Sequence, residues 1–456
     1  MALSRGALYG ILIVVVILVI AAAYFLTLPP APTPTTPVAT PTATTPTVTT
    51  PTVTTPTATT PVVKEVKIGV ILPLSGKLAE TGADLKKGIE FAVEKINAAG
   101  GIKNLGGAKL VVVWGDSAGD PATGAAEAER LIKEEKVVAL MGCYQSAVTK
   151  TASEVAESYK VPFLNPDSSS PTLTERGYKW FFRTTAHDGT FAVQHVEFIN
   201  YLNKTYGGLK TVAIINEDTE WGASTAKAWK ELFSAAGYKI VAEVSYHAAT
   251  VTSLDSEVEK LKAANPDVLL IAAYTNDGIL LVRTMKAKNF APKVALAQDS
   301  GFIDPAYVKQ IGKDGYYFLS REVFNWDLLE KIPELKKVND EYSAKYGISL
   351  NGNSARDYTG TWVLYWAIEE AAKVASPTDL EAFRKAIRDA LAKMEVSPDK
   401  IIMPWAGVKF DEKGQNVLAR GIIVQMSPDD GKYHTVYPIE VATKPIIFPF
   451  PSWEKR

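Results

Sequence analysis

From residue 66 onward, short runs of β-branched residues alternate with segments that have the apolar spacing of an amphipathic helix. Residues 66–72 form a buried strand by this criterion, and residues 84–99 follow with their apolar side chains on one helical face. Gly100 and Gly101 end that helix, because glycine readily takes the left-handed conformation of a helix cap. This alternation predicts parallel sheets whose strands are joined by helical crossovers.

The alternation forms two successive series. The first continues through residues 109–114 (strand), 121–135 (helix), 137–141 (strand), 147–158 (helix) and 161–164 (strand). The second runs from a helix at 191–202 to a strand at 293–297. The remaining third is richer in helix, with amphipathic stretches at 333–346, 357–373 and 380–393 and short strands at 408–410 and 421–425. We therefore expect an α/β protein with two doubly wound lobes of parallel sheet.

The first 63 residues have a different composition. Residues 8–26 are apolar, and no charged residue stands between Arg5 and Lys64, so the run is long enough to cross a bilayer. We expect residues 1–28 to anchor the chain with its remainder outside the cell; the alternative is a signal peptide cleaved near residues 21–23. Residues 29–63 are rich in Thr and Pro and predict an extended stalk, either O-glycosylated or bare.

The composition excludes several classes of function. Lys and Arg number 49 against 50 Asp and Glu, so no strong excess of positive charge favours nucleic acid. A single cysteine cannot form an internal disulfide or a Cys-rich metal site, and the four histidines lack metal-ligand spacing. Glycine-rich nucleotide loops are absent from the sequence. We expect no enzymatic activity, no cofactor and no metal.

Hydroxyl-rich turns follow two successive strands of the first series, at residues 142–146 and 165–171. In a doubly wound sheet, ligands bind beyond the carboxyl ends of the strands. Ser146 stands where a helix begins, so it is either a ligand for a carboxylate or the cap of its own helix. Cys143 in the same turn is either a reactive thiol or, as we expect, a small buried residue.

Several short stretches occur together in a specific order and spacing. They are IGVILPLSG at 68–76, GIEFAVEKIN at 88–97, GGI at 100–102, Asp116 with the Asp-Pro pair at 120–121, PTLTERGY at 171–178 and FRTT at 182–185. In these stretches the chain, over residues 66–438, resembles the substrate-binding proteins of ABC importers. The similarity is to the branched-chain amino-acid-binding (Leu/Ile/Val-binding, type I periplasmic binding protein) family.

The resemblance implies a clamshell of two lobes joined by three crossovers, near Asp188, residues 317–319 and residues 414–421. The implied division is an anchor at 1–28, a stalk at 29–63, lobe 1 at 64–187 and 318–414, lobe 2 at 188–317 and 415–445, and a tail at 446–456.

The resemblance also implies the residues that hold a small zwitterion. The positions that match the family's carboxylate ligands are Ser146 and Ser169, and those that match its ammonium ligands are Tyr274 and Asp299. A buried carboxylate needs several donors, and hydroxyls with helix-end N–H groups supply them; a buried ammonium needs a carboxylate. Plain packing remains the alternative for Tyr274, and a helix-leading acid the alternative for Asp299.

Three further positions complete the implied pocket. Trp221 would cover the ligand; the alternative is that Trp221 only packs in the core. Thr81 matches a pocket-lining position. Asp167 departs from the family, which usually has a small residue there, and Asp299 is one methylene shorter than the usual glutamate. A second acid favours a ligand with an extra donor, such as an amide, a urea-like group or a diamine.

The function implied is that of an extracytoplasmic solute-binding protein. It would capture an amino acid, branched-chain or a related small amphiphile, and deliver it to an ABC permease and its ATPase. The alternative is a ligand-sensing clamshell for an amide, urea or amino acid. We favour transport, because only seven residues precede the apolar run and a sensor needs an output domain on the cytoplasmic side.

Overall fold

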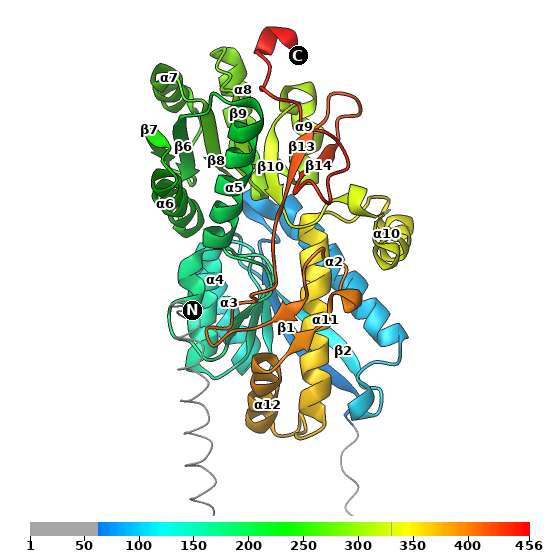
Figure 1. The fold of residues 1–456 in the computed structure, drawn as a ribbon. Coiled ribbons are helices and arrows are strands. Elements are labelled where there is room, and N and C mark those ends of the chain that lie inside the picture. The colour runs from blue at the N-terminus through cyan, green and yellow to red at the C-terminus, as the bar shows by residue number, and fades with distance from the viewer. Residues whose placement is uncertain (1–62, 330) are drawn as a thin grey trace, which may run out of the picture. The chain divides into compact units, whose positions relative to one another are not determined.

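The computed structural model describes residues 63–329 and 331–456 (Figure 1). The anchor predicted at 1–28 and nearly all of the predicted stalk lie outside the described residues. Within the described part of the chain, no helix combines the length and the hydropathy that a membrane crossing requires.

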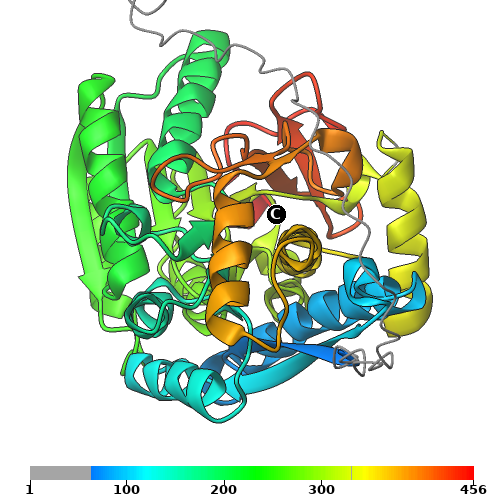
Figure 2. The same ribbon diagram turned by 90° about the horizontal axis from the view of Figure 1, so that it is seen from below.

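The first lobe is built on a fully parallel sheet of order β2-β1-β3-β4-β5. Its strands are β1 (Glu65–Leu72), β2 (Lys109–Asp116), β3 (Leu140–Gly142), β4 (Phe163–Asn165) and β5 (Phe181–Arg183). The helices of this lobe are α2 (Ala79–Ala98), α3 (Pro121–Lys133), α4 (Ser146–Ser158), α11 (Gly352–Ala372) and α12 (Leu380–Ala392). Figure 2 shows α11 nearly end-on with α12 beside it.

Alternation along each strand divides the core of this lobe into two layers, because successive side chains point to opposite faces. Ile71 and Leu140 pack under α3 and α4, whereas Val70 and Met141 belong to the larger cluster that includes Leu85 of α2. Both faces are therefore apolar, which is why the strands of this sheet appear as continuous apolar runs in the sequence.

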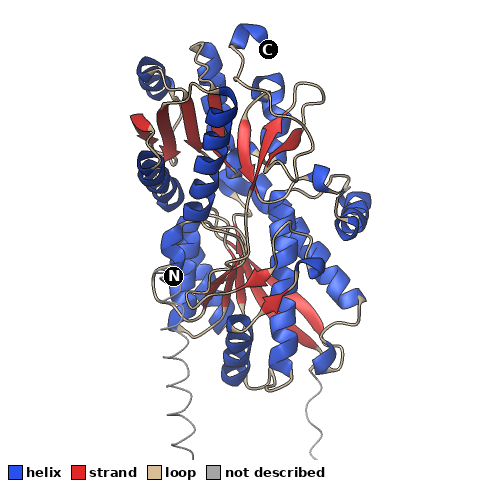
Figure 3. Ribbon diagram, in the orientation of Figure 1, coloured by secondary structure: helices blue, strands red, loops and turns tan. Residues whose placement is uncertain are grey.

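The second lobe holds a sheet of order β14-β13-β10-β9-β8-β6-β7. Its strands are β6 (Thr211–Glu217), β7 (Lys239–Tyr246), β8 (Val268–Ala272), β9 (Val294–Gln298), β10 (Leu319–Glu322), β13 (Ile422–Met426) and β14 (Tyr433–Tyr437). Its helices are α5 (Asp188–Tyr206), α6 (Glu220–Ala235), α7 (Asp255–Ala264), α8 (Thr275–Ala287) and α9 (Pro305–Ile311). Figure 3 shows one sheet in each lobe with helices around it.

We expected a fully parallel sheet in the second lobe, but this sheet is mixed. β13 pairs antiparallel with both β10 and β14. For β13 and β14 the reason is local, since only six residues connect them, and a parallel pair would need a long crossover. The remaining elements are α10 (Pro333–Tyr346) and a separate two-stranded sheet. That sheet consists of β11 (Glu395–Val396) and β12 (Val408–Lys409).

The chain passes between the sheets three times. It leaves β5 and enters α5 at Asp188. The second passage comes after Glu322 rather than at residues 317–319, because β10 pairs with β9 and β13 and so belongs to the second lobe. The third follows Gln415, which bridges to Arg183 of β5, and precedes Ile422, where β13 begins.

Arg183 ties the end of the first sheet to the turn after β4. Its side chain is fully buried. The guanidinium donates to the carbonyl oxygens of Ser168 and Ser170 at 3.2 and 2.6 Å and to Oε1 of Gln415 at 2.7 Å. A buried carbonyl without a donor is costly, so this one residue fixes both the turn and the third passage.

We expect Arg183→Met to lower the free energy of unfolding by about 3 kcal/mol, since two buried carbonyl oxygens lose a charged donor. Denaturant titration measures the effect. Arg283→Met is the matched control, because Arg283 is exposed and makes one hydrogen bond, to the Gln310 carbonyl at 3.2 Å. Equal losses in the two variants would show that Arg183 does not fix the turn.

Candidate ligand-binding site

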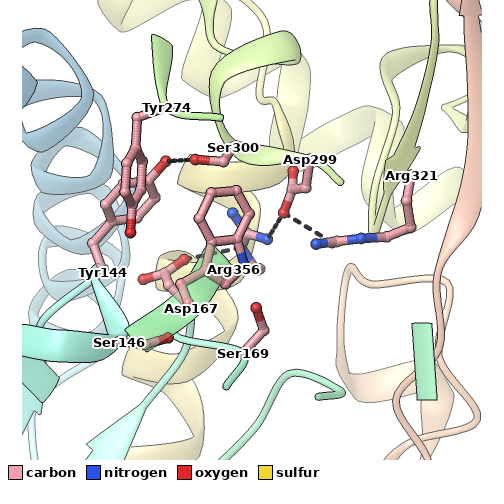
Figure 4. A pocket seen from close by; sticks show the side chains of 10 residues that line it. Tyr144, Ser146, Asp167, Ser169, Tyr274, Asp299, Ser300, Arg321 and Arg356 are labelled. Atoms are coloured by element: carbon pink, nitrogen blue, oxygen red, sulfur yellow. Dashed lines mark hydrogen bonds and ion pairs between the residues drawn. The ribbon is translucent and has the colours of Figure 1, made fainter. Parts of the chain in front are cut away.

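A pocket lies between the two sheets, with about 280 Å³ of empty space when its solvent-filled mouth is included (Figure 4). Its described lining consists of aromatic, hydroxyl and charged side chains and includes no aliphatic one. The lining residues are Tyr144, Ser146, Asp167, Ser169, Trp221, Tyr274, Asp299, Ser300, Arg321 and Arg356. Most of them directly follow the carboxyl ends of β3, β4, β8 and β9, where a doubly wound sheet binds its ligands.

The turn after β3 brings Ser146 into the pocket. Gly142 begins this turn with a φ of 126°, and a β-carbon there would lie 2.1 Å from the Ile71 carbonyl oxygen, so only glycine fits. Ser146 is the first residue of α4, and no side chain caps this helix. The Ser146 hydroxyl instead accepts a hydrogen bond from the Ser170 amide at 3.2 Å, which leaves its own proton free to donate. Ser146 is therefore not the cap of its own helix.

Cys143 in the same turn is fully buried, as expected for a small packing residue. Burial raises the pKa of its thiol well above the ordinary value, since a thiolate would be poorly solvated there. The thiol is therefore protonated at neutral pH.

The turn after β4 is locked to the first turn. Asn165 accepts the amides of Asp167 and Ser168 on its side-chain oxygen, at 3.0 and 2.8 Å. The Ser168 hydroxyl donates to the carbonyl oxygen of Tyr144 at 2.8 Å. These bonds hold Ser169 and Ser146 on the same side of the pocket (Figure 4).

Aromatic rings close another side of the pocket. The Tyr274 ring, which directly precedes α8, lies 4.9 Å from the Trp221 ring and 6.2 Å from the Tyr144 ring, between centroids. The Tyr144 hydroxyl lies 3.0 Å from the Ser300 hydroxyl, so this wall joins the two lobes. Such rings offer an apolar surface with a polar edge.

A chain of ion pairs crosses the pocket from one lobe to the other. Arg356 of α11 donates from Nε to Asp167 at 2.9 Å and from Nη1 to Oδ2 of Asp299 at 2.6 Å, with Nη2 held by Asn353 at 2.6 Å. The same Asp299 oxygen lies 2.8 Å from Nη1 of Arg321. The four charged side chains are nearly completely buried. Two of these charges are positive and two are negative, so the pocket suits a neutral zwitterion.

The two carboxylates differ in their surroundings. Burial raises the pKa of Asp167 to about 6, although Arg356 opposes the shift. Burial also acts to raise the pKa of Asp299, but the guanidinium groups of Arg321 and Arg356 outweigh it and hold that pKa below its ordinary value. Glu322 beside them has its pKa raised to about 8 by burial and by Asp299, and so adds little charge at neutral pH.

Six of the seven predicted site residues line this pocket, and Thr81 does not. The helix α2 begins at Ala79, five residues earlier than expected, so Thr81 lies in its first turn. There the Thr81 hydroxyl is buried and donates to Oδ2 of Asp304 in the second lobe at 2.5 Å. Thr81 therefore links the lobes outside the pocket.

Sequence reasoning missed the two arginines and two further lining residues, Tyr144 and Ser300. Tyr144 and Ser300 lie close to Ser146 and Asp299 in the same turns, so they could have been predicted by including every residue of those turns. Arg356 and Arg321 carry no such signal, since one lies on a helix and the other on a strand. In the described part of the chain, acidic, histidine and cysteine side chains form no cluster that could hold a metal ion.

Comparison with known proteins identifies the family of the chain. The family described as periplasmic binding protein matches residues 65–432. The Leu/Ile/Val-binding protein homolog 7 of Brucella suis is 30% identical over 397 residues, which cover 84% of this chain and 94% of the relative. Homolog 8 of the same organism is 31% identical and covers 84% of this chain and 93% of its own length.

Solved structures show the same fold. An extracellular ligand-binding receptor of Rhodopseudomonas palustris matches with a TM-score of 0.70 at 26% identity, over 82% of this chain and 99% of the receptor. The isoleucine complex of LivJ from Streptococcus pneumoniae matches with a TM-score of 0.68 at 23% identity, over 85% and 100% of the two chains. The resemblance inferred from short stretches is thereby confirmed, and the chain belongs to the periplasmic binding protein family.

Proposed function

We propose that this chain is an extracytoplasmic solute-binding protein that captures a small amino acid and delivers it to an ABC permease and its ATPase. The observation that carries the proposal is the buried pocket between the lobes, in which serine hydroxyls lie opposite a tyrosine and an aspartate. Relatives named as Leu/Ile/Val-binding protein homologues and a neighbour described as an amino-acid transporter's binding protein support it.

The α-carboxylate of the ligand is assigned to the serine side of the pocket. The hydroxyls of Ser146 and Ser169 and the start of α4 provide donors there without a bound counter-charge. A carboxylate removed from water needs several such donors, because each hydrogen bond replaces one to the solvent.

The α-ammonium is assigned to Asp299, with Tyr274 beside it. The Oδ2 atom of Asp299 accepts a hydrogen bond from Arg356 and lies 2.8 Å from Nη1 of Arg321, but Oδ1 has no hydrogen-bond partner among the described residues. Trp221 then covers the ligand from the second lobe. This assignment keeps the residues predicted from the sequence. It adds Arg321 and Arg356, which contact Asp299 and which the sequence analysis did not include.

Ligand capture is proposed to proceed by closure of the lobes about the three passages. Only the closed arrangement lets one molecule touch serines of the first lobe and Asp299 of the second, so the ligand stabilises that arrangement by its differential affinity. Residues 1–28 are proposed to anchor the chain at the outer face of the cytoplasmic membrane, on the strength of their apolar length alone. The threonines of residues 29–63 are proposed to carry sugar.

The proposed function predicts that the purified full-length chain binds at least one amino acid. Isothermal titration calorimetry should detect heat, and a ligand at 100 times its Kd should raise the free energy of unfolding by about 2.7 kcal/mol. The panel holds aliphatic and polar amino acids, simple amides and urea. Absence of both heat and thermal stabilisation across the panel would contradict the proposal. Cells that lack the chain should also lose uptake of the bound solute; unchanged uptake would favour a sensor.

The assignment of the carboxylate predicts the effect of a double substitution. We expect Ser146→Ala with Ser169→Ala to weaken an amino-acid ligand by about 3 kcal/mol, because two donors to a buried charge are lost. Calorimetry measures the change in Kd. Ser158→Ala, at the exposed end of the same helix α4, is the control and should leave the affinity unchanged. Equal affinity in wild type and double variant would exclude these serines from the site.

A further inference from the structure

The chemistry of the pocket differs from that of an aliphatic binding site. Its described lining contains no leucine, isoleucine, valine or alanine side chain. The oxygens Oδ2 of Asp167 and Oδ1 of Asp299 are both buried and have no hydrogen-bond partner among the described residues. The two residues are only 6% and 4% exposed, and both line the pocket. The pocket therefore presents two separate acceptor atoms.

Arg356 is already committed to these acids, whereas Nε and Nη1 of Arg321 have no hydrogen-bond partner among the described residues, although Nη1 lies 2.8 Å from Asp299. Each nitrogen of the Arg356 guanidinium donates to Asp167, Asp299 or Asn353. A second carboxylate on the ligand could approach Arg321, but it would face the two negative charges of Asp167 and Asp299. At Asp167 and Asp299 the unmet demand is for N–H groups, because buried acceptors are unfavourable until a donor reaches them.

The two acceptors lie on either side of one guanidinium group. Arg356 bonds to both aspartates at once, through Nε at 2.9 Å and Nη1 at 2.6 Å, and both aspartates line the same pocket. One small molecule can therefore reach both. With the α-ammonium at Asp299, as assigned above, the acceptor that remains is Oδ2 of Asp167.

We propose that the side chain of the bound amino acid ends in an N–H donor, as an amide or an amine does, and that Asp167 selects it over a branched aliphatic side chain. This inference rests on the proposed function and narrows it. A leucine in the same place would set methyl groups against charged atoms and leave the Asp167 acceptor unpaired. A site built around a hydrogen bond rejects analogues that lack the bonding group by large factors.

The test compares ligands of nearly equal shape on the full-length wild-type chain. Asparagine, leucine and aspartate differ at the end of one short side chain, and glutamine and 2,4-diaminobutyrate extend the donor series. We expect the best donor ligand to bind at least about 100-fold more tightly than leucine, isoleucine, valine and aspartate. Calorimetry gives each Kd.

The possible failures can be told apart. Leucine, isoleucine, valine or aspartate binding as tightly as the best donor ligand would overturn this inference and leave the proposed function standing. Binding of none of these amino acids would overturn this inference, and absence of binding across the wider panel would overturn the proposed function as well.

A substitution tests the residue itself. In Asp167→Asn, the amide oxygen can keep the bond to Arg356, while the amide nitrogen replaces the free acceptor with a donor. We expect the ratio of leucine Kd to asparagine Kd to fall at least tenfold. The control is Asp116→Asn, which changes a half-buried acid of the same lobe outside the pocket and should preserve the ratio.

An unchanged ratio in the Asp167 variant would overturn the assignment of the donor to Asp167. Thermal unfolding without ligand verifies that both variants are folded. If the Asp167 variant does not fold, the comparison of ligands on the wild-type chain decides the matter.

Discussion

The ion pair between Arg356 and Asp299 is the contact on which the geometry of the pocket depends. It joins α11 of the first lobe to the end of β9 in the second, at 2.6 Å between Nη1 and Oδ2. Removing such charges from water costs several kcal/mol each, which only a well-formed set of partners offsets. Asp167 and Arg321 complete that set. The positions of all four side chains are therefore linked. The arginines hold each aspartate by one oxygen and so fix where its other oxygen points.

The start of α11 explains why Arg356 points into the pocket. Asn351 caps this helix with its side chain, and Ser354 returns a hydrogen bond to the cap, so the first turn is fixed. Asn353 in that turn holds Nη2 of Arg356. The Asn351 amide also donates to Asp84 of α2 at 2.8 Å, which ties the helix to the lobe. A local helix signal thus orients a residue whose partners are distant in the sequence.

The sequence predicted what local patterns determine. Alternating strands and helices predicted two lobes, because the spacing of apolar residues identifies each βα unit from its own sequence. The turns after β3 and β4 could be placed at one edge, because parallel strands end together. Arg356 could not be found, since its partners Asp167 and Asp299 are 189 and 57 residues away and no spacing relates them. The second passage was misplaced for a similar reason, because β10 is assigned to a lobe by pairing and not by composition.

The fold determines the position of the ligand, whereas the chemistry of the pocket determines its identity. The two sheets and the passages between them decide where a ligand lies, and relatives named for leucine, isoleucine and valine are similar in sequence over most of the chain. The lining decides which ligand is accepted. Asp167 and Arg356 must be considered as one unit there, because either charge alone would be buried without its partner and would destabilise the protein by about 3–5 kcal/mol. A change of specificity in this pocket therefore has to leave Arg356 with a partner at position 167, as Asp167→Asn does, and a single residue compared by position is a poor guide to the ligand.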